Sequence, residues 1–442
     1  MTTQSKRFLG VQLSDGVGGW NMSTFYLTCV AAILLGTFVN AFQPFLFTEI
    51  MAIPSERHGV VAGQLNFAGE IAIIVSAALA GALSDKLGRK VVMVAGFVLV
   101  ALSLYLYPHA GSVPELLGYR VIYGVGIAAV TCMIVVLLAD YAQDVSRGKA
   151  AGFQGVCNGI GAVIALFVLL RLPAIFQNNG MAVIESGVMT YYLVVGLTLL
   201  LALLSFFGLK THVKATQHDS LAVRELVLIG LKEGRKPGIA LAYAAAFVSR
   251  ANLTIVGAFM PLWLANYGTE MAGMNSADAL KKAGGIVAIA QGVALMGAPF
   301  FGILTDKVNR VTALLIALAI SFVGYCSTAL ISDPFGGAMI AVVILIGLGE
   351  IGGIITSGVW IAQQTNEQTR GAVIGIFNLS GAVGILISSV AGGFLFDHWR
   401  AAGPFVFVGL CALAVMIGGL LMRRRIVRQA EADTAITAAA QA

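Results

Sequence analysis

Long apolar runs recur along the whole chain and restrict its fold more than any other feature. Charged and turn residues separate twelve of these runs, and each is about 20 residues or longer, enough for a helix to cross a bilayer. Hydrophobic residues make up 58% of the chain and charged residues 11%, whereas roughly a quarter of a soluble domain is charged. The sequence therefore predicts an all-α polytopic membrane protein.

The expected spans fall into two groups of six. They are 24–48, 59–83, 91–108, 114–139, 150–171 and 188–209, then 238–266, 281–304, 310–331, 336–361, 371–396 and 402–422. The longest connection, 210–237, separates the groups. We therefore expect an N-terminal segment (1–23), a first six-helix bundle (24–209), a central loop (210–237), a second six-helix bundle (238–422) and a tail (423–442).

The distribution of basic residues predicts the orientation. With both termini inside, 20 of the 27 Lys and Arg residues lie in inner segments, and four lie in outer loops: Arg57, Lys281, Lys282 and Arg400. Basic residues favour the cytoplasmic side of a membrane protein. We therefore expect both termini and the central loop in the cytoplasm, and a bacterial inner membrane as the location. The net charge of +6 then serves orientation and indicates no nucleic-acid partner.

The central loop contains a mixed segment, residues 220–233, in which apolar residues alternate with Arg224, Glu225 and Lys232. A short interfacial helix on anionic lipid headgroups fits this pattern. A solvated linker fits it equally well.

Two motifs occur once in each half. The charged turn Gly81–Lys90 has a weaker copy at Gly302–Arg310, 221 positions later. The second motif, Arg147-Gly148 followed by Gly152 and Gly161, recurs 223 positions later as Arg370-Gly371, Gly375 and Gly384. A duplicated six-helix unit is typical of secondary transporters, whose substrate site lies between the halves near the bilayer midplane.

The sequence resembles the major facilitator superfamily over residues 24–425. The turn Gly81–Lys90 is similar to the family signature between the second and third helices, Gly-x-Leu-Ala-Asp-Arg-x-Gly-Arg-Lys, and Arg120 with Tyr123–Gly126 resembles the motif of its fourth helix. The fifth helix keeps glycines at Gly155 and Gly159–Gly161 but lacks the proline of the family's antiporters. The resemblance implies two pseudo-symmetric six-helix bundles that work by alternating access.

The charged turn is a candidate conformational latch. Gly81 permits close approach, Asp85 is expected near the N-terminus of the eleventh helix, and the resemblance implies that Arg89 pairs with Asp140. The alternative is that the basic residues of the turn only enforce topology. In the second half, Asp306 and Arg310 remain, but Gln363 stands where Asp140 would be. We therefore expect a latch that depends mainly on the first half.

Four ionisable residues lie deep in the expected spans: Glu70, Arg120, Arg250 and Glu350. Such residues are costly in a bilayer unless paired or hydrated, which makes them functional candidates. The two acids are candidates for proton coupling, with Glu350 expected to be accessible because glycines flank it. Either arginine could bind an anionic group. The structural alternative is that acids and arginines form ion pairs with each other.

Polar uncharged residues in the spans complete the set of cavity candidates. They are Asn40, Gln43, Gln64, Asn66, Asn158, Asn252, Gln291 and Asn378. Asn66 and Glu70 are four residues apart and so share one helix face. Each of these residues could instead make an interhelical hydrogen bond.

No cofactor, metal site or enzyme activity is expected, since the five cysteines and five histidines show no metal-ligand spacing and no phosphate-binding loop is present. We interpret the chain as a secondary transporter, acting as a monomer among membrane lipids, for a small amphipathic and anionic organic molecule. Proton coupling and efflux are the favoured mode. The alternatives are a proton-coupled importer of an organic anion and a lipid or lysolipid flippase on the same fold.

Overall fold

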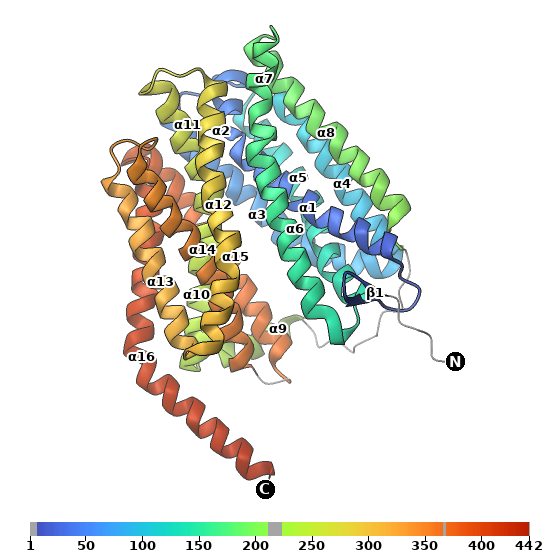
Figure 1. Cartoon of the computed structure of the whole chain (residues 1–442), viewed down its shortest axis with the longest axis vertical. Helices are drawn as coiled ribbons and strands as arrows, with labels where there is room; N and C mark the ends of the chain where they lie inside the picture. Colours follow the sequence, from blue (N-terminus) through green and yellow to red (C-terminus); the bar gives the residue numbers. More distant parts are fainter. Residues whose placement is uncertain (1–6, 211–222, 366–367, 442) are drawn as a thin grey trace. The chain divides into compact units, whose positions relative to one another are not determined.

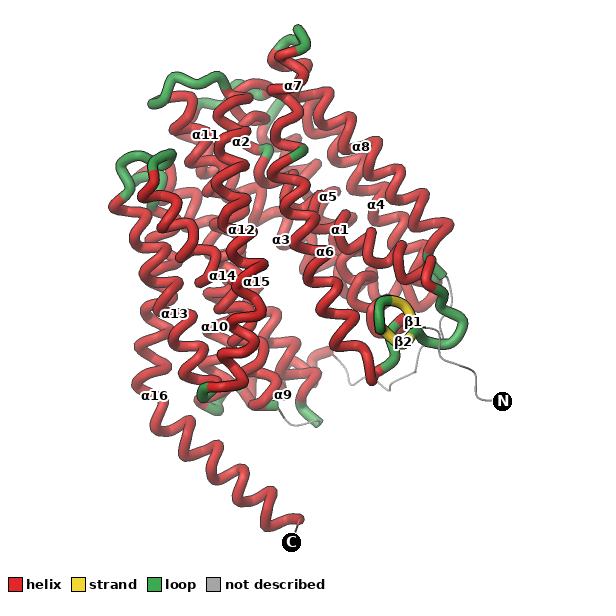
Figure 2. Tube along the Cα trace, in the orientation of Figure 1, coloured by secondary structure: helices red, strands yellow, loops and turns green. Residues whose placement is uncertain are grey.

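The computed structural model describes residues 7–210, 223–365 and 368–441, and this part of the chain is almost entirely helical (Figure 2). It contains 12 helical segments long and apolar enough to cross a membrane, which confirms the predicted fold class. They are Gly19–Ile50, Ser55–Leu87, Arg89–His109, Val113–Tyr141, Asp144–Asn178, Val183–Gly208, Pro237–Glu270, Ser276–Lys307, Arg310–Leu330, Gly337–Gln364, Arg370–His398 and Gly403–Arg423.

The first six spans and the N-terminal segment before them are built from the following elements. They are β1 (Arg7–Phe8), β2 (Val11–Gln12), α1 (Gly19–Ala41), α2 (Gln43–Phe45), a π-helical turn (Leu46–Ile50), a 3-10 turn (Ser55–Arg57), α3 (His58–Leu87), α4 (Arg89–Leu106), a 3-10 turn (Tyr107–His109), α5 (Val113–Tyr141), a 3-10 turn (Asp144–Ser146), α6 (Arg147–Phe167), a 3-10 turn (Leu169–Arg171), α7 (Leu172–Asn178) and α8 (Val183–Gly208).

The remaining elements continue the chain. They are α9 (Val223–Glu233), α10 (Pro237–Thr254), a π-helical turn (Ile255–Phe259), α11 (Met260–Glu270), α12 (Ser276–Lys307), α13 (Arg310–Ser327), a 3-10 turn (Thr328–Leu330), α14 (Gly337–Gln364), α15 (Arg370–His398) and α16 (Gly403–Gln441).

The helical segments extend beyond most of the predicted spans. The fifth was expected at 150–171 and occupies Asp144–Asn178, and the eighth was expected at 281–304 and occupies Ser276–Lys307. The prediction followed the apolar runs, whereas backbone hydrogen bonding continues a helix through the polar residues at its ends.

The chain forms two compact units. Unit 1 comprises Met1–His218 and Gly257–Gln291, and unit 2 comprises Asp219–Val256 and Gly292–Ala442. In unit 1, α3 and α4 pack on α5, and α4 lies beside α8 (Figure 1). In unit 2, α13 packs on α14 and α16, and α10 packs on α15. The division by sequence into two halves differs from these units at residues 257–291 and stays a prediction.

Glycines show that the sequence repeat is also a repeat of packing. A Cβ at Gly161 of α6 would lie 2.3 Å from the Val30 carbonyl oxygen of α1, and a Cβ at Gly384 of α15 would lie 2.2 Å from the Phe247 carbonyl oxygen of α10. Only glycine permits such approach, so each of these two residues brings its helix against a neighbouring backbone. The two positions are those that the sequence aligned with an offset of 223.

The N-terminal segment forms a hairpin that the sequence did not predict. β1 and β2 pair antiparallel, and β2 with the residues after it bonds to the end of α5 and to the turn between α5 and α6. Ser146 Oγ accepts a hydrogen bond from the Gln12 backbone N–H at 2.9 Å, and Ser14 N–H donates to the Tyr141 carbonyl at 3.0 Å. Val11 is fully buried.

The described part of the central loop contains a packed helix. A Cβ at Gly230 of α9 would lie 2.6 Å from the Ala372 carbonyl of α15, and the Gly230 carbonyl accepts a hydrogen bond from the Tyr243 hydroxyl at 3.0 Å. These contacts favour the helical interpretation of the mixed segment over the solvated linker. Residues 211–222 of the loop lie outside the described residues.

Candidate functional site

The charged turn in unit 1 is organised around Arg89. The Arg89 Nη1 atom lies 2.5 Å from Asp85 Oδ1 and donates to Ser84 Oγ at 2.6 Å, and Nε lies 3.4 Å from Asp140 Oδ2. The pairing with Asp140 is therefore present, with both side chains largely buried. The Asp85 side chain is 67% exposed. Its approach to the eleventh helix stays a prediction, and so does the latch.

Gly88 sets the geometry of this turn. It ends α3 with φ of 92° and ψ of 147°, a region that residues other than glycine rarely adopt. Because α4 begins at the next residue, this one conformation places Arg89 beside the end of α3. Gly81 is less constrained, since a Cβ there would meet Cys132 Sγ at 3.9 Å, an ordinary contact.

The copy in unit 2 lacks this network. Among the residues that the structure describes, neither Asp306 nor Arg310 takes part in an ion pair. Asn309 begins α13 by accepting a hydrogen bond from Val311 N–H at 3.0 Å on its side-chain oxygen.

A buried polar cluster in unit 1 surrounds Arg120 of α5, which is 6% exposed. Its Nη2 atom donates to Asn40 Oδ1 of α1 at 2.7 Å and to Asn66 Oδ1 of α3 at 3.0 Å. Gln43 Nε2 lies 3.5 Å from the same Asn40 oxygen. Gly69 makes room for the arginine, because a Cβ there would lie 2.8 Å from Arg120 Nε. Three predicted cavity residues are thus brought together with Arg120.

The cluster keeps unused hydrogen-bonding capacity. Arg120 Nε and Nη1 and Asn66 Nδ2 are buried donors that make no hydrogen bond of normal geometry in the described part of the chain, and Gln43 Oε1 is a buried acceptor that makes none. Tyr123, whose ring centre lies 5.2 Å from the Arg120 guanidinium carbon, and Tyr191 add two buried hydroxyls without a partner there. Buried polar groups are normally satisfied, so these atoms mark a place for a ligand or water.

The predicted residues of α3 differ in how far they are buried. Glu70 is half-buried, and Gln64 is exposed. Asn66 is 6% exposed and bonded to Arg120. The helix therefore presents Asn66 to the cluster.

The candidates in unit 2 are more dispersed. Asn252 is 1% exposed, and its Nδ2 atom lies 3.5 Å from Ser321 Oγ, so it joins α10 to α13 as an interhelical hydrogen bond. Arg250 is exposed and packs beside Gly381 of α15, where a Cβ would lie 2.6 Å from Arg250 Cγ.

Glu350 of α14 is 2% exposed, and the glycines around it serve helix packing. A Cβ at Gly349 would lie 2.7 Å from Ser321 Cα, one at Gly352 would lie 2.6 Å from Phe301, and one at Gly353 would lie 2.8 Å from Ser249 Oγ. The open space predicted around Glu350 was therefore wrong, because neighbouring helices fill the room that these glycines leave.

Three further predicted residues are less buried than Arg120 and Asn66. Asn158 and Gln291 are half-buried, and Asn378 is exposed. The alternative of structural ion pairs is also wrong for the two arginines: within the described residues, no ion pair includes Arg120 or Arg250.

The sequence did not predict hydrogen bonds between distant spans in unit 1. His58 at the start of α3 is 2% exposed, and its ring lies between Asn266 Oδ1 of α11 at 3.2 Å and the Ile53 carbonyl at 2.9 Å. Ser276 Oγ of α12 also donates to Glu49 Oε1. A lone histidine after Glu56 and Arg57 gave no signal of this contact.

The helices and their repeated packing define a twelve-span membrane transporter. A family model described as the Major Facilitator Superfamily matches residues 24–356 and 242–440. The chain belongs to this family, whose characterised members among its relatives are transporters and not enzymes.

Three similar proteins illustrate the relationship. The chain is 26% identical to magnetosome protein MamH of Paramagnetospirillum magneticum, over 93% of this chain and 95% of that protein. It is 24% identical to a probable nitrate transporter, NarT, of Staphylococcus epidermidis, over 85% and 88% of the two chains. The crystal structure of the nucleoside transporter NupG aligns with a TM-score of 0.73 at 15% identity, covering 91% of this chain and 98% of that one, and so supports the fold alone.

Proposed function

We propose that this protein moves a small organic molecule with a carboxylate or phosphate group across the membrane by alternating access, and that Arg120 binds the anionic group. The observation that carries the proposal is the buried Arg120 guanidinium, whose Nε and Nη1 atoms make no hydrogen bond of normal geometry in the described part of the chain.

A buried guanidinium with spare donors is suited to an oxyanion. A charge in a low-dielectric site is costly unless it is paired, and arginine stays charged even when buried. The side-chain oxygens of Asn40 and Asn66 hold Nη2, which fixes the orientation of the group without neutralising it. An incoming carboxylate or phosphate would supply the missing charge and accept a charge-assisted hydrogen bond from Nε or from Nη1, which lie on different edges of the guanidinium.

Uncharged groups beside Arg120 suit the rest of such a substrate. Gln43 Oε1 can accept a hydrogen bond, and the Tyr123 and Tyr191 hydroxyls can donate or accept. The aromatic rings of Phe38 and Phe42, with centroids 5.6 and 5.2 Å from that of Tyr191, add apolar surface. That NarT is described as a probable nitrate transporter is consistent with anion transport on this fold.

The test is a transport assay on the full chain in liposomes, with a panel of small organic carboxylates and phosphates. Replacing Arg120 by Gln should weaken binding of the transported anion about 30-fold or more, because a charged hydrogen-bond partner is lost from a buried site. Arg120→Lys should restore part of the affinity. The matched control is Arg57→Gln, which removes an exposed arginine. Wild-type affinity in Arg120→Gln would exclude this site.

We propose a proton as the coupling ion, carried by Glu70 or Glu350, since these are the acids we place deep within the spans. Replacing the carrier by Gln preserves its size but prevents proton release. Such a variant should lose transport driven by a pH gradient and still exchange substrate, whereas loss of a structural acid should lower the melting temperature. If both single variants keep full proton-driven flux, these acids are not the carriers.

Export is the direction we favour, because the fifth span keeps the glycines of the family's antiporters. Import of the same anion is the alternative. Flux measured in vesicles of both orientations, with the proton gradient imposed in each direction, distinguishes the two. Net movement of the anion with the proton would establish import and exclude export.

A further inference from the structure

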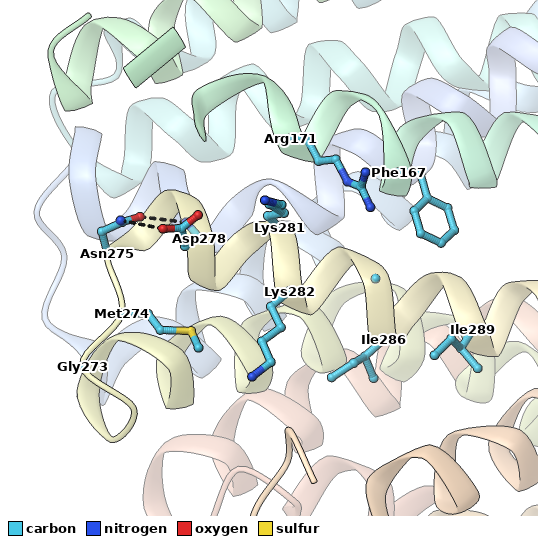
Figure 3. A pocket seen from close by; sticks show the side chains of 11 residues that line it. Phe167, Arg171, Gly273, Met274, Asn275, Asp278, Lys281, Lys282, Ile286 and Ile289 are labelled. Carbon is cyan, nitrogen blue, oxygen red and sulfur yellow. Dashed lines mark hydrogen bonds between the residues drawn. The ribbon is translucent and has the colours of Figure 1, made fainter. Parts of the chain in front are cut away.

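The structure holds a cavity of about 800 Å³ in unit 1, and Arg120 is not among the residues that line it. It lies between the end of the fifth span and the start of the eighth (Figure 3). Phe167 and Arg171 line it from one side, and α12 lines it from the other with Lys281, Ile286 and Ile289.

The cavity wall is basic at one end and apolar at the other. Arg171, Lys281 and Lys282 line it, against one acid, Asp278. Asp278 is already engaged, because its Oδ2 accepts from Asn275 Nδ2 at 2.8 Å (Figure 3). Phe167 and the two isoleucines supply the apolar part. Phe167 lies about one helical turn from Arg171, and Ile286 and Ile289 lie about one and two turns from the two lysines.

This concentration of positive charge is unusual for its position. The topology predicts four Lys and Arg residues in outer loops, and two of the four, Lys281 and Lys282, line this one cavity. Basic residues favour the inner side, so orientation does not account for a cluster here. Lys281 and Lys282 also stand where the eighth span changes from charged to apolar sequence, which is the depth expected for lipid headgroups.

Glycines shape the cavity. A Cβ at Gly284 would lie 2.8 Å from the Leu166 carbonyl, so α12 rests directly on the fifth span there. At the next residue, Gly285, a Cβ would have nothing within 4 Å, and this residue lines the cavity. One glycine thus closes the packing and the other leaves space.

We propose that this cavity binds an anionic phospholipid of the outer leaflet, with the phosphate between Arg171 and Lys281 and an acyl chain along Phe167, Ile286 and Ile289. The charge complements the phosphate, and the apolar wall complements the chain. A soluble anion would use the basic end but gain nothing from the apolar one. The site is independent of the transport function proposed for Arg120.

Native mass spectrometry of the full chain tests the proposal. After delipidation, the protein is titrated with phosphatidylglycerol or with zwitterionic phosphatidylcholine, and bound lipid is counted. The double variant Arg171→Gln with Lys281→Gln should bind phosphatidylglycerol about 10-fold or more weakly, because each basic residue near an anionic lipid contributes roughly a factor of five. Binding of phosphatidylcholine should be weak in both proteins.

Two further variants make the result specific. Arg57→Gln with Arg400→Gln removes two exposed positive charges that do not line the cavity, and it should bind phosphatidylglycerol like the wild type. Gly285→Leu fills the cavity without changing charge, and it should reduce binding of the lipid. Melting temperatures confirm that each variant is folded.

Three outcomes would overturn the proposal. The first is equal loss of phosphatidylglycerol binding in the control pair, which would indicate a general charge effect. The second is wild-type binding in both the basic double variant and Gly285→Leu. The third is replacement of each bound lipid by one molecule of glycerol phosphate at millimolar concentration, which would indicate a site for soluble anions.

Discussion

The two copies of the charged turn share a local hydrogen bond and differ in their electrostatics. In the first copy, Ser84 Oγ donates to the Gly81 carbonyl at 2.7 Å, and in the second, Thr305 Oγ1 donates to the Gly302 carbonyl at the same distance. Only in the first copy, within the described residues, does an arginine connect this hydroxyl to acids.

Two substitutions account for the difference. Gln363 stands where the repeat aligns Asp140, so the second copy lacks the carboxylate that Arg89 uses. Asn309 stands where the repeat aligns Gly88, and its φ of −55° replaces the φ of 92° that starts α4 immediately after α3. The comparison shows that a duplicated turn can keep its helix end while one copy alone keeps the ion pairs.

The largest expected effect is at Arg89. Arg89→Gln leaves Asp140, whose side chain is 15% exposed, without its counterion, and should lower the free energy of unfolding by about 1–3 kcal/mol. The matched change Arg310→Gln should alter it by less than about 0.5 kcal/mol, because no ion pair is lost. Thermal melting in detergent measures both. Equal destabilisation would show that the two copies are energetically alike.

Exchanging the residues at positions 88 and 309 tests whether their different backbone angles distinguish the two copies. Gly88→Asn forces a residue with a side chain into backbone angles that favour glycine, and should lower the free energy of unfolding by about 1–3 kcal/mol. Asn309→Gly removes a helix cap but keeps a compatible backbone, and should cost only a few tenths of a kcal/mol. The melting temperature of Gly88→Asn should therefore fall further. The reverse order would contradict the role given to φ.

The sequence predicted the twelve spans, because apolar length is a property of single segments. It also predicted the Arg89–Asp140 pair through a motif. The partners of Arg120 could not be predicted, since Asn40 and Asn66 lie on other helices and the contact depends on how α1, α3 and α5 pack.

The environment of Glu350 was mispredicted for the same reason. Glycines beside an acid leave space in a single helix, but the sequence does not say that Ser321 and Phe301 fill it. The N-terminal hairpin was missed because residues 7–12 are too few to show a strand pattern, and the residues that anchor it, Tyr141 and Ser146, lie far along the chain.

The exposed acid of each copy should matter for transport more than for stability. Asp85→Asn should change the free energy of unfolding by less than about 1 kcal/mol, since the Asp85 side chain is 67% exposed. If the first copy is the latch, this variant should still reduce the transport rate several-fold, and Asp306→Asn should not. The measurement is flux in liposomes alongside melting temperature. Equal loss of flux in both variants would show that the latch does not depend mainly on the first half.

The last comparison separates the shared hydrogen bond from the network built on it. Ser84→Ala removes a hydroxyl that donates to Gly81 and accepts from Arg89, so it should cost about 1–2 kcal/mol, as expected for a hydrogen bond to a charged group. Thr305→Val removes a hydroxyl that bonds only its own helix among the described residues, and should change stability by less than about 0.5 kcal/mol. The decisive measurement repeats Ser84→Ala in an Arg89→Gln background, where the cost should shrink because the two residues share one interaction. Full additivity of the two changes would mean that Ser84 acts on the helix end alone and that the two copies differ only in their carboxylates.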